Sequence, residues 1–239
     1  KIQFIISVKR TDRNLTLIMN RVLSMITGYS LILMAILAGF SYGYVFTKFY
    51  KPNSPDLVQA DFLGNQELYM WMVIGFICIV LLDFLISWTI LKLFKKENPQ
   101  LAFITSLLRF LYTVIFFRAI IFLKNNIELS NKHGLEINQN FEYFLYTWSI
   151  GLILFGIHLI LLALILKKHQ YIPKFIWYLM LIAGISYLAT NSMKIFVPGK
   201  YDTANLLENI LALPMVLGEL CFAFWLIFKR KMTIKALTK

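Results

Sequence analysis

Six long apolar stretches alternate with short polar segments along this chain. They run near residues 22 to 46, 68 to 94, 101 to 123, 143 to 166, 175 to 197 and 207 to 228. At about 1.5 Å per residue, each is long enough to cross roughly 30 Å of hydrocarbon as an α-helix. Pro, Gly and Asn mark the connections between them. The pattern predicts an all-α, polytopic membrane protein with six transmembrane helices in one bundle.

The amino-acid composition also indicates a membrane protein and excludes an ordinary soluble domain. Hydrophobic residues make up 59% of the 239 positions, charged residues make up 15%, and the mean hydropathy is +0.69. A soluble globular domain is far more polar. Short connections leave no stretch for a separate soluble domain, so we expect one membrane domain over residues 22–228. Cys78 and Cys221 fall in mid-span and are expected to be small buried hydrophobes, not a disulfide.

The formal net charge of +12 is concentrated at particular connections. Most Lys and Arg residues lie in the N-terminal segment, in the second and fourth connections and in the C-terminal tail. By the positive-inside rule, both termini are then cytoplasmic, and 1–21 and 229–239 are basic cytoplasmic segments of a protein in the cell's inner membrane. Two hypotheses stay open for 1–21, which either lies on the inner leaflet or is a disordered tail.

Four ionisable residues lie deep inside the apolar spans: Asp83, Arg109, His158 and Glu219. Such a group costs roughly 2.5 to 3.5 kcal/mol at membrane depth, so it normally has a partner or a task. Counting along the helices places all four in one layer. One hypothesis is a ligand or proton site, with the two carboxylates as titratable acceptors, Arg109 as counter-ion or anion ligand and His158 as the pH-sensitive member. The other is a set of structural ion pairs that fix helix register.

Further polar residues follow the same spans at helical spacing. Thr105 and Tyr112 share a stripe with Arg109 and are expected to face the interior. A weaker set lies toward the outer face and consists of Arg118 in span three with Tyr187, Thr190, Asn191 and Lys194 at helical spacing in span five. We expect these residues to lie at the membrane interface; if the set were an entrance, Arg118 and Lys194 would favour an anionic group.

Two backbone features accompany these polar positions. Gly39 and Gly43 form a small-x-x-x-small pattern, from which we predict close internal helix packing, with a homodimer contact as the alternative. Pro214 removes a helix hydrogen bond shortly before Glu219, which frees a carbonyl near Ile210.

No familiar soluble active-site motif occurs in the chain. It lacks a Gly-rich phosphate loop, a Gly-x-Ser-x-Gly elbow, a Cys-x-x-Cys pair and a His-Glu-x-x-His helix. We therefore assign no catalytic residue, metal or cofactor. The expected partners are membrane lipids and a membrane protein or a second copy of the chain, and no nucleic acid.

Several short stretches appear in an order that resembles a bacterial membrane family catalogued as domain of unknown function 4386. They include Leu81-Leu82-Asp83, Leu107-Leu108-Arg109-Phe110, Phe155-Gly156-Ile157-His158, Tyr171-Ile172-Pro173-Lys174, Gly184 through Leu188, and Pro214 through Trp225. The likeness runs from about Asn14 to Lys231 and implies a six-span fold but no activity. The family usually has an acidic residue after the Tyr-Leu pair of span five, where this chain has Ala189-Thr190-Asn191.

The sequence supports three functional hypotheses. The first is a polar intramembrane pocket that binds or passes a small solute or a proton. The second is a non-catalytic accessory or scaffold subunit of a larger membrane complex. The third is an intramembrane lipid hydrolase in which His158 and a carboxylate activate water, and it lacks an obvious nucleophile.

Overall fold

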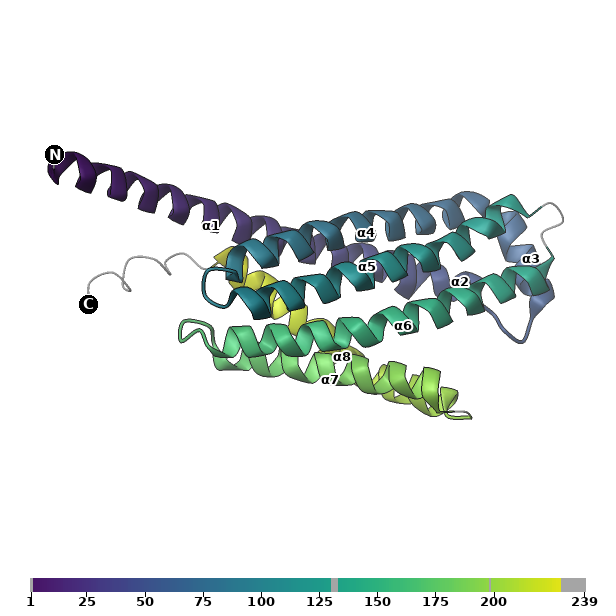
Figure 1. The fold of residues 1–239 in the computed structure, drawn as a ribbon. Coiled ribbons are helices and arrows are strands. Elements are labelled where there is room, and N and C mark those ends of the chain that lie inside the picture. The colour runs from purple at the N-terminus through teal and green to yellow at the C-terminus, as the bar shows by residue number, and fades with distance from the viewer. Residues whose placement is uncertain (1, 130–132, 198, 229–239) are drawn as a thin grey trace.

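The structure is a computed structural model that describes residues 2–129, 133–197 and 199–228, with side chains from Asn20 onward. It contains eight α-helices and one π-helical segment in the described residues (Figure 1). They are α1 (Ile2–Ala38), η1 (Gly39–Phe46), α2 (Thr47–Phe49), α3 (Pro55–Gly64), α4 (Gln66–Phe94), α5 (Pro99–Glu128), α6 (Gly134–Lys167), α7 (Lys174–Phe196) and α8 (Tyr201–Phe228).

The long helices surround a common interior in chain order. Each of α1, α4, α5, α6 and α7 packs against the next, and α8 returns to contact α1, which closes the ring. With an even number of spans, the bundle-side part of α1 and the end of α8 lie at the same end (Figure 1). Six helices are long and apolar enough to cross a membrane, the first being the continuous stretch Asn20–Phe49. The predicted six-span helical fold is confirmed.

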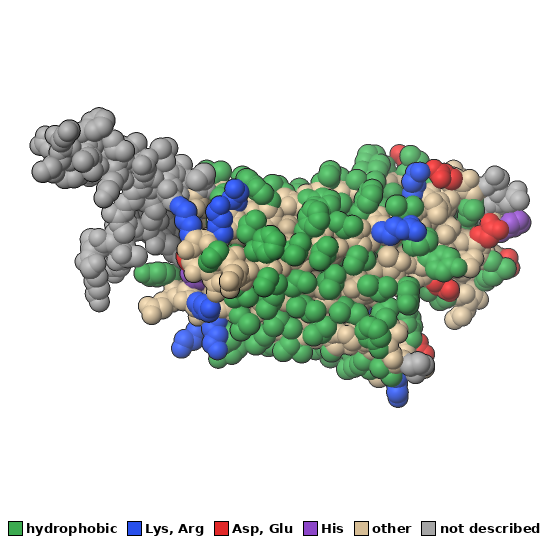
Figure 2. Space-filling model, in the orientation of Figure 1, with side chains coloured by type: hydrophobic (Ala, Val, Ile, Leu, Met, Phe, Trp, Pro, Cys, Tyr) green, Lys and Arg blue, Asp and Glu red, His purple; other side chains and the backbone are tan. Residues whose placement is uncertain are grey.

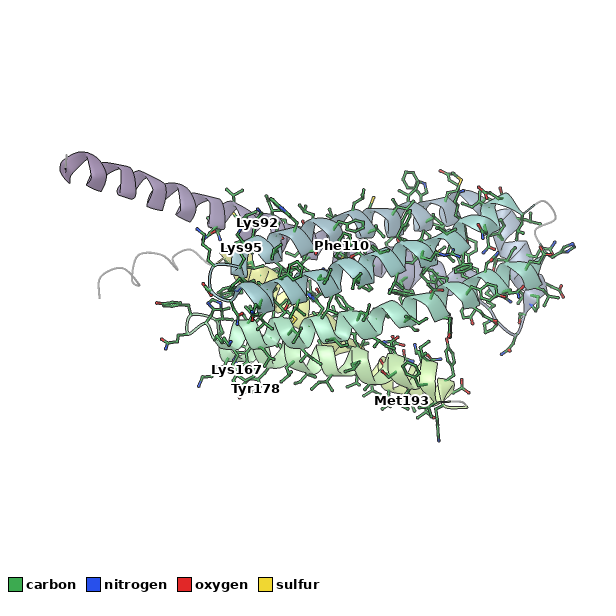
Figure 3. The ribbon with its side chains drawn as sticks, in the orientation of Figure 1. Lys92, Lys95, Phe110, Lys167, Tyr178 and Met193 are labelled. Atoms are coloured by element: carbon green, nitrogen blue, oxygen red, sulfur yellow. The ribbon has the colours of Figure 1, made fainter. Side chains whose placement is uncertain are left out.

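The surface has the distribution of side chains expected for a bundle in lipid. Hydrophobic side chains cover the middle of the face shown in Figure 2, where they form a belt, and charged side chains gather toward its two ends. Lys92, Lys95 and Lys167 lie together at one end, which we call the basic end (Figure 3). Because lipid acyl chains are apolar, exposed residues such as Trp88 and Phe110 on this belt are stable in contact with them.

The helices extend beyond the apolar stretches from which they were predicted. Among the spans after α1, the largest difference is in α6, which begins at Gly134, whereas hydropathy placed the start of the span near residue 143. Its added turns are polar outside but bury Ile137 and Phe141. They pack against α3, a short helix that begins at Pro55. Hydropathy averages over such an amphipathic extension and therefore misses it.

Glycines allow two close helix contacts. At Gly156 an added Cβ would lie 2.7 Å from the backbone nitrogen of Leu188 and 2.8 Å from the carbonyl oxygen of Gly184, so α6 and α7 touch backbone to backbone. At Gly28 it would lie 2.6 Å from Ile227, which brings α1 against the end of α8. Small residues permit this approach where helices lack a hydrophobic driving force.

The prediction of close internal packing at Gly39 and Gly43 is wrong. An added Cβ at either glycine would have no neighbouring atom within 4 Å. The motif lies in η1, which diverges from α8 and borders a cavity, so spacing alone did not reveal what the glycines face. The dimer alternative stays a prediction. The expected membrane-surface contacts of 1–21 involve side chains outside the described residues, apart from Asn20 and Arg21, and the tail 229–239 also lies outside them.

Candidate functional site

Arg109 lies at the centre of the bundle and joins the ionisable residues of the spans. Its Nε and Nη2 donate to Oδ1 of Asp83 at 2.9 and 2.6 Å, and its Nη1 donates to Oε1 of Glu219 at 3.0 Å. Nη1 also lies 3.4 Å from Nε2 of His158. Four helices, α4, α5, α6 and α8, each contribute one member. We call these four residues the Arg109 cluster.

The guanidinium of Arg109 has no hydrogen-bond capacity left over. It carries five N–H groups in all. Asp83 accepts two of them, Glu219 and His158 accept one each, and Nη2 lies 3.7 Å from the sulfur of Met34. The side chain is 1% exposed. Arg109 therefore acts as a counter-ion to the carboxylates and offers nothing to an incoming anion.

Hydrogen bonding assigns the protonation state of His158. Its Nδ1 lies 2.8 Å from the carbonyl oxygen of Thr105, which can only accept, so Nδ1 carries a proton. Nε2 faces an N–H of Arg109 and must then accept. The ring is neutral and both of its nitrogens are engaged. Thr105, a secondary polar position from the sequence, thus contributes its backbone carbonyl to the orientation of His158.

The charges of the cluster do not balance. With a neutral imidazole, one guanidinium faces two carboxylates, which leaves one excess negative charge when both are ionised. Oδ2 of Asp83 is buried and accepts no hydrogen bond from any residue that the structure describes. Glu219 is the more accessible carboxylate, with 17% of its side chain exposed. The excess charge therefore lies on the side of Asp83 and Glu219.

A cavity of about 460 Å³ extends from these two carboxylates toward the end of the bundle opposite the basic end. Asp83 and Glu219 form its floor, and neither Arg109 nor His158 is part of its wall. Neighbouring aromatic rings follow one another around the interior with centroids 4.8 to 6.0 Å apart. This aromatic wall consists of Tyr42, Trp148, Phe116, Tyr112, Phe155 and Tyr187.

The mouth of the cavity lies between η1 and α8. The exposed residues of its lining come from these two elements only, namely Gly39, Gly43, Asn209, Ala212 and Val216. Their outward neighbours are apolar and exposed, as at Tyr44 and Ile210. The mouth therefore lies on an apolar part of the surface, between two helices that are long and apolar enough to cross a membrane. On the opposite side of the cluster, contact between Gly28 and Ile227 keeps α1 and α8 together.

The other polar residues selected from the sequence, Tyr112, Asn191 and Arg118, lie in three different surroundings. Tyr112 lies on the cavity wall, where its hydroxyl accepts from the indole of Trp148 at 3.5 Å. Asn191 is buried in α7 and donates to the carbonyl of Tyr187. Arg118 lies on the exposed face of α5 with its guanidinium 4.8 Å from the ring of Phe122. The structure therefore does not gather Arg118 and Asn191 into an entrance.

Glu208 is a cavity residue that the sequence analysis did not select. Its carboxylate pairs with Lys194 beside the mouth, so its charge is compensated. Glu208, Ala212, Met215 and Glu219 are spaced four, three and four residues apart, which places them on one face of α8. This spacing was visible in the sequence, whereas nothing in the sequence separates the aromatic residues of the wall from those that face lipid.

The geometry offers no catalytic centre at His158. The ring is fully buried, is absent from the cavity wall and has both nitrogens engaged, so it cannot take a proton from water in the cavity. Within the described part of the chain, no three His, Cys, Asp or Glu residues are placed to hold a metal ion. His158 therefore lies outside the cavity with both ring nitrogens engaged.

Comparison with known proteins identifies one matching family and one relative of this chain. The model of the family described as "Domain of unknown function (DUF4386)" matches residues 26–229. An uncharacterized protein of Archaeoglobus fulgidus is 27% identical over 168 residues, which cover 70% of this chain and 89% of that protein. No solved structure matches the chain. The family match includes all four members of the Arg109 cluster and every residue that lines the cavity, and this chain belongs to the DUF4386 family.

Proposed function

We propose that this protein binds a small, largely apolar solute in its intramembrane cavity, as the binding step of uptake, release or sensing of that solute. The observation that carries the proposal is the cavity itself, which has aromatic sides and a floor of two carboxylates. Its volume of about 460 Å³ falls in the range of small-molecule sites, roughly 300 to 1,000 Å³. A few polar groups in an otherwise apolar lining are also typical of such sites.

The arrangement of charge supports a binding role over a purely structural one. A register-fixing ion pair is most stable when its charges balance and its hydrogen bonds are complete. Here Asp83 keeps an unpaired, buried oxygen, and Glu219 remains partly exposed on the cavity floor. The cluster is therefore complete around Arg109 but leaves one carboxylate oxygen of Asp83 without a donor among the described residues.

Filling the mouth tests the proposal. We expect Gly39→Phe to abolish retention of a bound small molecule, because Gly39 borders the mouth and an added side chain there meets no neighbouring atom. The protein would be extracted with its surrounding lipid and analysed by native mass spectrometry for mass beyond the chain. The signal of the bound molecule should fall by about tenfold or more, the equivalent of about 1.4 kcal/mol.

Gly64→Phe is the matched control. Gly64 ends α3, and an added Cβ there also meets nothing within 4 Å, but the residue is outside the cavity. The control should retain the same molecules as the unaltered protein. Equal retention by all three proteins would contradict the proposal. A stoichiometric protein partner, with no small molecule, would favour the accessory-subunit hypothesis.

We further propose that the basic end faces the cytoplasm and that the cavity opens toward the outer leaflet of the cell membrane. The Lys residues at the basic end support this orientation, because cytoplasmic loops are enriched in Lys and Arg. A membrane-impermeant maleimide applied to intact cells should label Asp56→Cys, in α3, but not Lys96→Cys, between α4 and α5. Both positions are exposed. The reverse labelling would show that the protein is inverted.

A further inference from the structure

We propose that the solute is a lipophilic organic cation, an ammonium or related onium group carried on an apolar body. This inference rests on the proposed function and names the chemical class that the cavity takes. It follows from three features of the cavity: the charge of its floor, the chemistry of its wall and the direction in which it opens.

With both carboxylates ionised, the floor carries one negative charge more than Arg109 compensates. Asp83 and Glu219 line the cavity, whereas Arg109, their shared counter-ion, is shielded behind them with every N–H engaged. An anion entering the cavity would meet two carboxylates and no free donor from Arg109. A cation would compensate the excess charge, and Glu219, with 17% of its side chain exposed, is the carboxylate that it would reach. Buried charges are tolerated when paired, so the floor favours a cation.

The sides of the cavity suit the same ligand. Faces of Trp, Tyr and Phe rings attract cations within about 6 Å through their quadrupole, and more strongly when water is excluded. The aromatic wall supplies six such rings from four elements, η1, α5, α6 and α7, and Phe76 of α4 lies beside Phe116. The same rings bury the apolar body of the ligand. Aromatic cages of this kind are a known means of binding quaternary ammonium groups.

The remaining charges near the cavity do not alter this balance. Glu208 lies close to the mouth, but Lys194 compensates it, and the Lys194 side chain is 8% exposed. The mouth itself opens between the apolar outer faces of η1 and α8. A ligand that enters there must first partition into lipid. These conditions select a cation with a large apolar surface over a small hydrated ion.

Shape-matched probes of opposite charge test the inference. Tetraphenylphosphonium and tetraphenylborate have the same four-ring shape, and triphenylphosphine oxide is a neutral relative. Binding of each to the full-length protein in phosphatidylglycerol nanodiscs would be measured by equilibrium dialysis and corrected with protein-free nanodiscs. We expect the cation to bind at least about tenfold more tightly than either other probe. Equal affinities, or a preference for tetraphenylborate, would overturn the inference.

Variants of Glu219 locate the selectivity. Glu219→Gln leaves one guanidinium facing one carboxylate, so the excess charge disappears and the preference for the cation should fall about tenfold. Glu219→Asp keeps the charge and should retain most of the preference. An unchanged preference in a folded Glu219→Gln protein would refute the role of the floor. If that variant does not fold, the ranking of the three probes by the unaltered protein decides the question.

Gly39→Phe separates this inference from the proposed function. If it abolishes binding of all three probes and the probes bind equally to the unaltered protein, the cavity is a binding site but the cation preference is wrong. If tetraphenylphosphonium binds Gly39→Phe unchanged, binding occurs elsewhere and both proposals fail.

The onium group can belong to a free solute or to the headgroup of a lipid. Replacing phosphatidylglycerol by phosphatidylcholine or phosphatidylethanolamine distinguishes these sources. Competition by the amine-containing lipids, seen as weaker tetraphenylphosphonium binding, would identify a headgroup, and equal binding in all nanodiscs would identify a free cation. Either result supports an onium site, provided that the cation remains preferred over the other two probes.

Discussion

Replacing Arg109 by Met is expected to lower the free energy of unfolding by about 3 to 5 kcal/mol, the largest effect of any single substitution considered for this protein. The change leaves Asp83 and Glu219 without their shared counter-ion inside the bundle, and removing one partner from a buried ion pair has a cost of this size. The comparison would be made by dodecyl sulfate denaturation of the purified protein in mixed micelles, monitored by circular dichroism.

Arg118→Met is the matched control for that experiment. It removes the same side chain from the same helix, but Arg118 is exposed and contacts Phe122. We expect a change within about 1 kcal/mol, since exposed interactions contribute little. Neutralising the whole cluster, with Arg109→Met, Asp83→Asn and Glu219→Gln together, should recover much of the lost stability. Equal losses for Arg109→Met and Arg118→Met would show that the cluster does not hold the bundle together.

Gly156→Ala is expected to destabilise the protein by roughly 1 to 3 kcal/mol, or more. The added Cβ would lie 2.7 Å from the nitrogen of Leu188 and 2.8 Å from the oxygen of Gly184, and both atoms are backbone. No side chain can rotate away to relieve this overlap, so α6 and α7 must separate. The same dodecyl sulfate denaturation would measure the loss.

The same change from Gly to Ala at residue 39 is expected to leave stability unchanged or to raise it. An added Cβ at Gly39 meets nothing within 4 Å, and Ala is favoured over Gly in a helix by about 1 kcal/mol. We expect Gly39→Ala to be neutral or stabilising. An equal loss of stability in both variants would contradict the assignment of tight packing to Gly156 and open space to Gly39.

The members of the Arg109 cluster were predictable from the sequence, but their hydrogen bonds were not. Asp83, Arg109, His158 and Glu219 stood out because charged and titratable groups are costly in apolar spans, and residue counting gave them a common depth. Their hydrogen bonds were not predictable, because helix rotation and the order of helices around the ring decide which atoms meet. Arg109 was accordingly left as either counter-ion or anion ligand, and only the structure shows every N–H of its guanidinium engaged.

The cavity could not be predicted because it forms where two segments distant in sequence diverge. Gly39 and Gly43 had the spacing of a packing motif, but in η1 they border open space. The close glycine contact instead lies between Gly156 and Gly184, whose approach depends on the crossing of α6 and α7. Local spacing defines the face of one helix and carries no information on what that face meets.

By itself, the sequence determined that this protein is a helical bundle of six membrane spans with a polar layer inside. Those properties follow from hydropathy, helix rise and the cost of charge in lipid, which act on each segment separately. Tertiary structure alone decided that Arg109 is enclosed by its partners, that Asp83 and Glu219 line an aromatic cavity, and that the mouth lies between η1 and α8. These properties depend on relations between helices, and no single segment encodes them.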